Sequence, residues 1–194
     1  MKRIILITLT LPLICFGCGQ KAKYIQTGGT QSIVSVGEVD IQDIQGAARG
    51  LLDSMFLTGV LNKAEHQPAR IVVEAVVNDT SSRFDTGELL HRMRAQLVNS
   101  GQAAVETAFG QAESQVAQDA LKKKAFLEGK TASDVFNPDF ALTGKITQMK
   151  RSAGNTNQTT YTFRLTLTNM NTGLEAWTDY VNVTKQGSHN AIGF

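Results

Sequence analysis

The sequence is poor in cysteine, and its two cysteines, Cys15 and Cys18, both lie near the amino terminus. The chain beyond residue 18 therefore has no thiol for a disulfide or a metal site, and its fold must rest on a hydrophobic core. No later hydrophobic run is long enough to cross a membrane as a helix. The sequence thus excludes a disulfide-stabilised scaffold and a membrane-spanning helix beyond residue 18.

The amino-terminal segment is typical of a secretory signal. Two basic residues are followed by a mostly apolar run over residues 4–14, which is too short to span a bilayer stably. Gly17 directly precedes Cys18, which resembles the lipobox of bacterial lipoproteins, although Cys15 stands where that motif usually has leucine. We therefore expect cleavage between Gly17 and Cys18, and acylation of the Cys18 thiol to anchor the protein in a membrane. An uncleaved anchor and an ordinary secreted protein are the alternatives.

An excess of charge of one sign is also lacking. The whole sequence has 19 basic and 17 acidic residues, and removal of the signal takes away Lys2 and Arg3, which leaves the mature chain formally neutral. Binding to nucleic acid needs a basic stripe. The single basic run, Lys122 to Lys124, is explained by a solvated helix face. We expect no nucleic acid among the partners.

Residues 18–39 show little hydrophobic periodicity, contain no proline and include a pair of glycines. We expect them to form a tether between the lipid anchor and a folded domain that spans residues 40–194. Ile33, Val34 and Val36 are exceptions in this segment, and they favour an extended stretch that packs on the domain or on a partner.

The domain alternates helical and strand patterns, which predicts a single α/β domain with a mixed β-sheet flanked by helices. Apolar spacings of three and four predict helices, and β-branched or alternating runs predict strands. The expected helices lie within residues 41–56, 85–101 and about 111–127, and the expected strands within residues 69–77, 104–108, 140–149, 160–168 and 174–183.

Three of these strands carry further predictions. Residues 69–77 have apolar side chains at both parities, which predicts a central strand covered on both faces. The last two strands alternate cleanly and predict a hairpin with one buried and one wet face. We expect Trp177, on the returning strand of the hairpin, to be at least partly buried.

No arrangement typical of catalysis is present. The sequence lacks the H-E-x-x-H, G-x-S-x-G, G-x-x-x-x-G-K-[ST] and G-x-G-x-x-G motifs. The scattered histidines are His66, His91 and His189. The acidic residues that could meet as an acid–base pair are Asp79, Asp85, Glu88 and Asp139, although helix caps and turns explain each of them. We therefore expect no enzyme, no metal site and no cofactor.

Four segments together carry a family resemblance. They are ARIVVEAVVNDTSSRFDTGELLHRMRAQLVNSG (69–101), FALTGKI (140–146), YTFRLTLTNMNTGLEAW (161–177) and VTKQGS (183–188). In order and spacing they resemble the LpoB family, outer-membrane lipoproteins that activate bifunctional class A penicillin-binding proteins. The resemblance covers most of residues 33–194. It implies a fold like the N-terminal domain of TolB, no catalysis, and a role in peptidoglycan synthesis and cell-wall biogenesis.

The leading hypothesis is a non-enzymatic lipoprotein that binds and activates a bifunctional penicillin-binding protein, a glycosyltransferase and transpeptidase. The alternative is a structural or assembly lipoprotein of an envelope or secretion complex. Gly19 follows the acylated cysteine in place of the aspartate that retains lipoproteins at the inner membrane of enteric bacteria. We therefore expect an outer-membrane protein that faces the periplasm. The resemblance names no partner-binding residues, and the short tether differs from the family's long proline-rich linker.

Overall fold

Five strands build one mixed sheet. They are β2 (Ala69–Asp79), β3 (Ala103–Val105), β4 (Phe140–Ala153), β5 (Thr156–Asn169) and β6 (Glu175–Ser188). In the order β3-β2-β4-β5-β6, β2 runs parallel to both of its neighbours, and β4, β5 and β6 run antiparallel to one another. The computed structural model describes residues 23–27, 29–105, 114–129, 137–188 and 192–193, so Gly17 and Cys18 lie outside the described residues.

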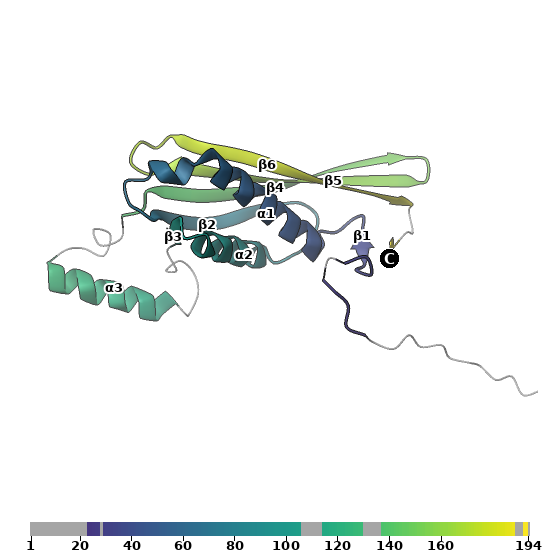
Figure 1. Ribbon diagram of the computed structural model, residues 1–194. Helices are drawn as coiled ribbons and strands as arrows, with labels where there is room; N and C mark the ends of the chain where they lie inside the picture. Colours follow the sequence, from purple (N-terminus) through teal and green to yellow (C-terminus); the bar gives the residue numbers. More distant parts are fainter. Residues whose placement is uncertain (1–22, 28, 106–113, 130–136, 189–191, 194) are drawn as a thin grey trace, which may run out of the picture.

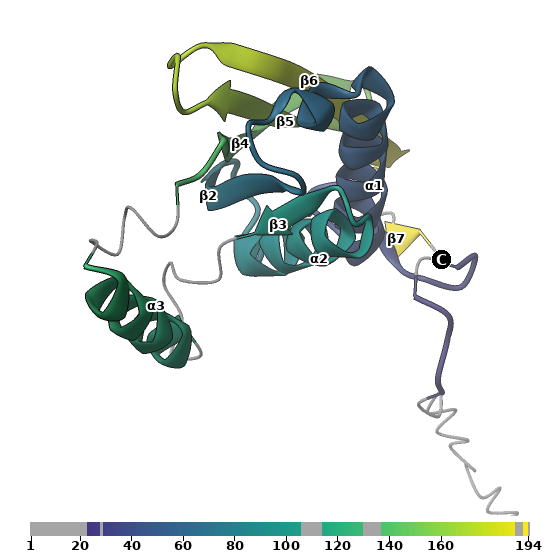
Figure 2. The ribbon, with the colours of Figure 1, turned by 60° about the vertical axis from the view of Figure 1, so that its left-hand side comes forward.

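Two long helices cover one face of this sheet. The helices of the described residues are α1 (Ile41–Thr58), the short 3-10 helix η1 (Val60–Lys63), α2 (Thr86–Asn99) and α3 (Ser114–Glu128). α1 and α2 lie side by side on the same face, whereas α3 stands apart from the sheet (Figure 1 and Figure 2). As the sequence predicts, α1 starts directly after Asp40 and α2 directly after Asp85. None of the helices in the described ranges is long and apolar enough to cross a membrane.

The hydrophobic core lies between α1, α2 and the inner face of the sheet. Apolar side chains of both helices meet alternate residues of β4 and β5, as the period of a half-buried strand requires. The largest fully buried side chains include Leu51, Leu52, Met55, Met93, Leu97, Phe140, Leu142, Ile146, Tyr161 and Phe163. Trp177 is only 8% exposed, which confirms its expected burial, while Leu174 and Tyr180 on the same hairpin are exposed.

The prediction that residues 69–77 are covered on both faces is wrong. Ile71 and Val73 point into the core, but Val77 is 57% exposed on the face that α1 and α2 leave bare. The register of β2 against β4 shifts between Val73 and Val76, which marks a bulge and returns Val76 to the core. The bulge accounts for the burial of Val76, whereas Val72, before the bulge, is only half-buried.

The segment that precedes α1 is part of the folded body. A two-residue strand, β1 (Val34–Ser35), pairs antiparallel with β7 (Ile192–Gly193) near the end of the chain. Gly37, which follows β1 in this segment, contacts the sheet: its carbonyl accepts a hydrogen bond of 2.7 Å from the Tyr161 hydroxyl. Burial, together with nearby carboxylates, raises the pKa of Tyr161 to about 12, so this hydroxyl keeps its proton at neutral pH.

Candidate functional site

The acidic residues that the sequence offered as a possible acid–base pair each have a separate structural partner. Asp79 pairs with Lys145 at 2.8 Å, and Glu88 pairs with Arg92 at 2.5 Å one helical turn away. The Asp85 carboxylate caps α2 by accepting a hydrogen bond from the Gly87 N–H. The remaining acid, Asp139, lies beside the start of β2, at the opposite end of that strand from Asp79.

Asp139 does have a histidine partner that the sequence did not indicate. The His66 Nδ1 atom lies 2.8 Å from the buried Asp139 carboxylate, which also accepts from the backbone N–H groups of Arg70 and His66. Burial alone would raise the pKa of Asp139, but these hydrogen bonds and the nearby imidazole outweigh it and lower the pKa.

The His66–Asp139 pair ties the loop before β2 to the start of β4. Within the described ranges no hydroxyl group is hydrogen-bonded to the His66 ring, so the pair lacks the nucleophile of a catalytic triad. His91 is exposed on α2, and His189 lies outside the described residues. In the same ranges no three histidine, aspartate or glutamate side chains gather as metal ligands would.

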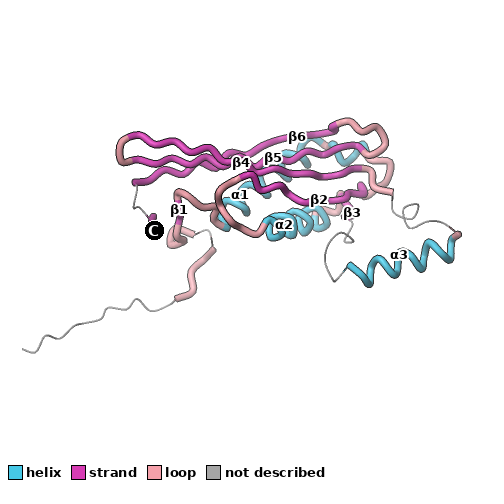
Figure 3. The backbone as a smooth tube through the Cα atoms, turned by 180° about the vertical axis from the view of Figure 1, so that it is seen from behind, coloured by secondary structure: helices cyan, strands magenta, loops and turns pink. Residues whose placement is uncertain are grey.

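The outer face of the sheet is bare and polar. Figure 3 shows this face from behind, with β4, β5 and β6 uncovered by α1 and α2. Hydroxyl groups there bond across the strands, as between Thr166 and Thr178 at 3.0 Å and between Thr160 and Thr184 at 2.9 Å. A shallow hollow of about 450 Å³ surrounds Tyr180 on this face.

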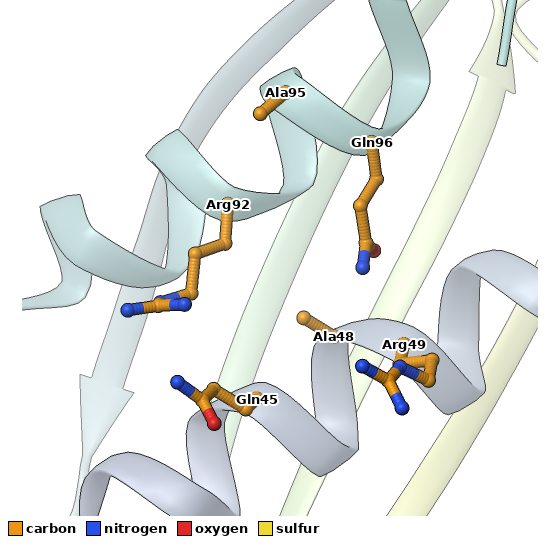
Figure 4. Close-up of a pocket in the computed structure, with 6 residues that line it drawn as sticks. All are labelled: Gln45, Ala48, Arg49, Arg92, Ala95 and Gln96. Carbon is orange, nitrogen blue, oxygen red and sulfur yellow. The ribbon is translucent and has the colours of Figure 1, made fainter. Parts of the chain in front are cut away.

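A second concave surface lies between the two packed helices. This α1–α2 groove has a volume of about 310 Å³ and is lined by Gln45, Ala48, Arg49, Arg92, Ala95 and Gln96. In Figure 4, Arg92 lies across the groove from Gln45, and Gln96 lies across from Arg49. The two alanines have no side chain beyond Cβ, and their small size leaves the space between the polar groups open.

The polar groups of the α1–α2 groove are incompletely paired. Arg92 has one ion-pair partner, Glu88, and its Nε atom is buried without a hydrogen-bond partner among the described residues. The Oε1 atom of Gln96 is buried and unpartnered in the same sense. Arg49 is exposed and has no carboxylate within ion-pair distance in the described part of the chain. The groove is therefore suited to bind a negatively charged group that also forms hydrogen bonds.

A family model described as the peptidoglycan-synthase activator LpoB matches residues 43–183. The chain belongs to the LpoB family. The matched residues run from the first turn of α1 into β6, so they include the α1–α2 groove and the outer face of the sheet. The family resemblance expected from the sequence is thereby confirmed.

Solved structures of LpoB domains are among those similar to this chain. The LpoB C-terminal domain from Salmonella enterica is 16% identical, with 73% of this chain and 98% of that chain covered at a TM-score of 0.44. The corresponding domain from Escherichia coli is 15% identical, with 74% and 99% covered at 0.44. A lipoprotein from Neisseria meningitidis is 20% identical, with 64% and 86% covered at 0.38. A search of curated protein sequences found no match.

The groove of this LpoB family domain was not predicted from the sequence. Its residues do follow a repeated pattern of a polar residue at position i, an alanine at i+3 and a polar residue at i+4. The pattern is Gln45, Ala48 and Arg49 on α1, and Arg92, Ala95 and Gln96 on α2. Such residues share one face of a helix. The pattern alone could not show that the two faces meet, because that depends on how the helices pack on the sheet.

Proposed function

We propose that this LpoB family protein binds a bifunctional peptidoglycan synthase, a class A penicillin-binding protein, and activates it without catalysing a reaction itself. The observation that carries the proposal is the match of the activator family model to residues 43–183, nearly the whole folded body.

The proposal includes a lipid anchor on Cys18 at the outer membrane, facing the periplasm. The folded body begins near Ile33, just before β1, so about 15 residues separate it from the anchor. Fully extended, such a segment reaches roughly 50 Å at about 3.4 Å per residue. The folded body would then begin within that distance of the membrane, and the synthase surface that it contacts would lie no farther away than that distance plus the length of the domain.

Activation by binding requires a preference for one state of the synthase. If the domain binds the active conformation more tightly than the inactive one, it shifts the population by that difference in affinity. A tenfold preference corresponds to about 1.4 kcal/mol, which a modest set of extra contacts can supply. No chemistry on the side of the activator is needed.

The test is the rate of glycan polymerisation by the synthase of the same organism, measured with and without a soluble fragment that begins at Gln31. We expect a saturable increase in rate, because the fragment retains β1 and all later elements of the body. Thermally unfolded fragment at the same concentration serves as the control. Unchanged rates together with no detectable binding would contradict the proposal.

A further inference from the structure

The α1–α2 groove contains buried polar atoms whose hydrogen-bonding capacity is unused. The Nε–H of Arg92 is a donor and the Oε1 of Gln96 is an acceptor, and neither has a partner among the described residues. Buried polar groups in folded proteins are nearly always paired, and an unpaired one calls for an explanation such as a water, an ion or a partner molecule; the Nε of Arg94, outside the groove, is unpaired as well. The two groove atoms belong to residues one helical turn apart on α2, and both are covered by the chain itself, so a ligand in the groove reaches them only when the Arg92 and Gln96 side chains turn outward.

The charge of the groove favours a carboxylate. Arg49 on one wall and Arg92 on the other are its two cationic groups, and Glu88 compensates only the second of them. A guanidinium group presents its N–H donors in a planar fork that fits a carboxylate. The chain supplies no second carboxylate to this groove among the described residues, so the groove is open to one from another molecule.

The glutamines make the recognition more specific than charge alone. A bare anion would satisfy the arginines but would leave the carbonyl of Gln96 without a donor. An acidic residue within a polypeptide supplies both groups, because its side chain accepts from the arginines and its backbone N–H donates to the Gln96 carbonyl. The volume of about 310 Å³ accommodates one or two side chains of such a segment.

We propose that the α1–α2 groove binds an acidic segment of the partner protein, with a carboxylate held between Arg49 and Arg92. The identity of the partner rests on the proposed function, which makes it the periplasmic part of the peptidoglycan synthase. The groove is thus the contact surface that sets orientation on the synthase, and its occupant is an aspartate or glutamate in an exposed loop.

The test compares the affinity of the synthase for the Gln31 fragment and for its Arg49→Gln/Arg92→Gln variant. Removal of both arginines should weaken binding at least about tenfold, since buried arginine contacts are frequent hot spots. Raising the salt concentration should weaken binding of the original fragment more than that of the variant. Salt screens the charges of Arg49 and Arg92, which only the original fragment has. A second variant, Ala95→Phe, should weaken binding to a similar extent by filling the groove without a change of charge.

The matched control is Arg83→Gln/Arg151→Gln, which removes two exposed arginines outside the groove and should change affinity less than about twofold. Circular dichroism melting verifies that each variant is folded. If the original fragment binds the synthase and both groove variants bind it equally well, the groove inference is overturned and the proposed function stands.

If the original fragment does not bind, the proposed function fails and the inference with it. Loss of self-association in the groove variants, with unchanged affinity for the synthase, would assign the groove to a second copy of the chain and also overturn the inference.

Discussion

A single buried ammonium group, that of Lys185, holds the start of α1 against β6. Its Nζ atom lies 2.5 Å from a carboxylate oxygen of Asp40 and 2.5 Å from one of Asp43, and it donates to the Glu38 carbonyl at 2.7 Å. Lys185 is 7% exposed and Asp43 is 8% exposed. In such a dry place the charges are tolerated only because they compensate one another.

Replacement of Lys185 by methionine should therefore be costly. The change keeps an unbranched apolar stem but leaves two carboxylates without a counter-charge, which should lower the free energy of unfolding by about 3–5 kcal/mol. Urea unfolding at neutral pH measures the loss. The matched control is Lys145→Met, which breaks an ion pair whose side chains are 49% and 61% exposed and should cost less than about 1 kcal/mol. Equal losses in the two variants would show that the buried cluster has no special weight.

Asp139 gives the domain a predictable dependence on acid. Because the pKa of its carboxyl is lower in the folded chain than the ordinary value of 3.8, its ionised form favours the folded state. That contribution is complete above the ordinary pKa and is lost as the pH falls through the lowered one. Asp139→Asn should cost about 1–3 kcal/mol at neutral pH, because the backbone N–H of Arg70 loses a charged acceptor.

The pH profile separates this effect from a general loss of packing. Thermal unfolding between neutral pH and about pH 3 should show a smaller acid-induced loss of stability in Asp139→Asn than in the original chain. A parallel pair of profiles would mean that Asp139 does not carry the expected share of acid sensitivity.

At the scale of elements, the sequence predicts strands best where the pattern is uninterrupted. The strict alternation of β5 allowed its buried face, which includes Tyr161 and Phe163, to be predicted, because period 2 alone decides it. β2 was predicted as a strand but with the wrong environment, since the bulge between Val73 and Val76 changes the parity of its buried residues. A bulge depends on the partner strand, which a local pattern does not contain.

Gly144 shows how closely the elements approach at that bulge. A Cβ atom added there would lie 2.9 Å from Val76 Cγ2 and 2.9 Å from Leu165 Cδ2, closer than side-chain contacts normally allow. Gly144→Ala should therefore overpack the core and cost about 1–3 kcal/mol in urea unfolding. The double variant Gly144→Ala/Val76→Ala should lose less than the sum of its single variants, because one of the two clashes is removed. Strict additivity would contradict the proposed contact.

The edge of the sheet carries its own protection against pairing with another chain. β6 is a long edge strand, yet Asp179 and Lys185 point their charges toward the helical side, where Asp179 accepts a hydrogen bond from Ser54 and Lys185 meets the α1 start. Inward-pointing charges of this kind discourage edge-to-edge association. A docking surface on the α1–α2 groove fits better with this architecture than addition of a strand at β6.

At the scale of the whole molecule, long-range contacts decide where the tether ends and the body begins. The contacts that fix this boundary join Glu38 and Asp40 to Lys185, and Gly37 to Tyr161, across more than half of the chain. No local pattern in residues 18–39 contains this information, although Ile33, Val34 and Val36 indicated that the segment would not be wholly loose. The α1–α2 groove could not be predicted for the same reason, because it depends on how two separate helices pack on the sheet.

The boundary leads to a prediction about truncation and insertion. A fragment that begins at Gln31 should be as stable as a longer one, whereas a fragment that begins at Ile41 loses Asp40 and the Gly37 carbonyl. Lys185 and Tyr161 then lose buried partners, and the free energy of unfolding should fall by about 2–4 kcal/mol. A flexible insertion of glycine and serine after Thr30 should leave stability unchanged, but the same insertion after Gly37 should destabilise the domain. Urea unfolding of the five proteins measures these differences. If both insertions are equally harmless, residues 33–40 do not belong to the folded body, and the usable length of the tether is longer than the roughly 50 Å estimated from its extended residues.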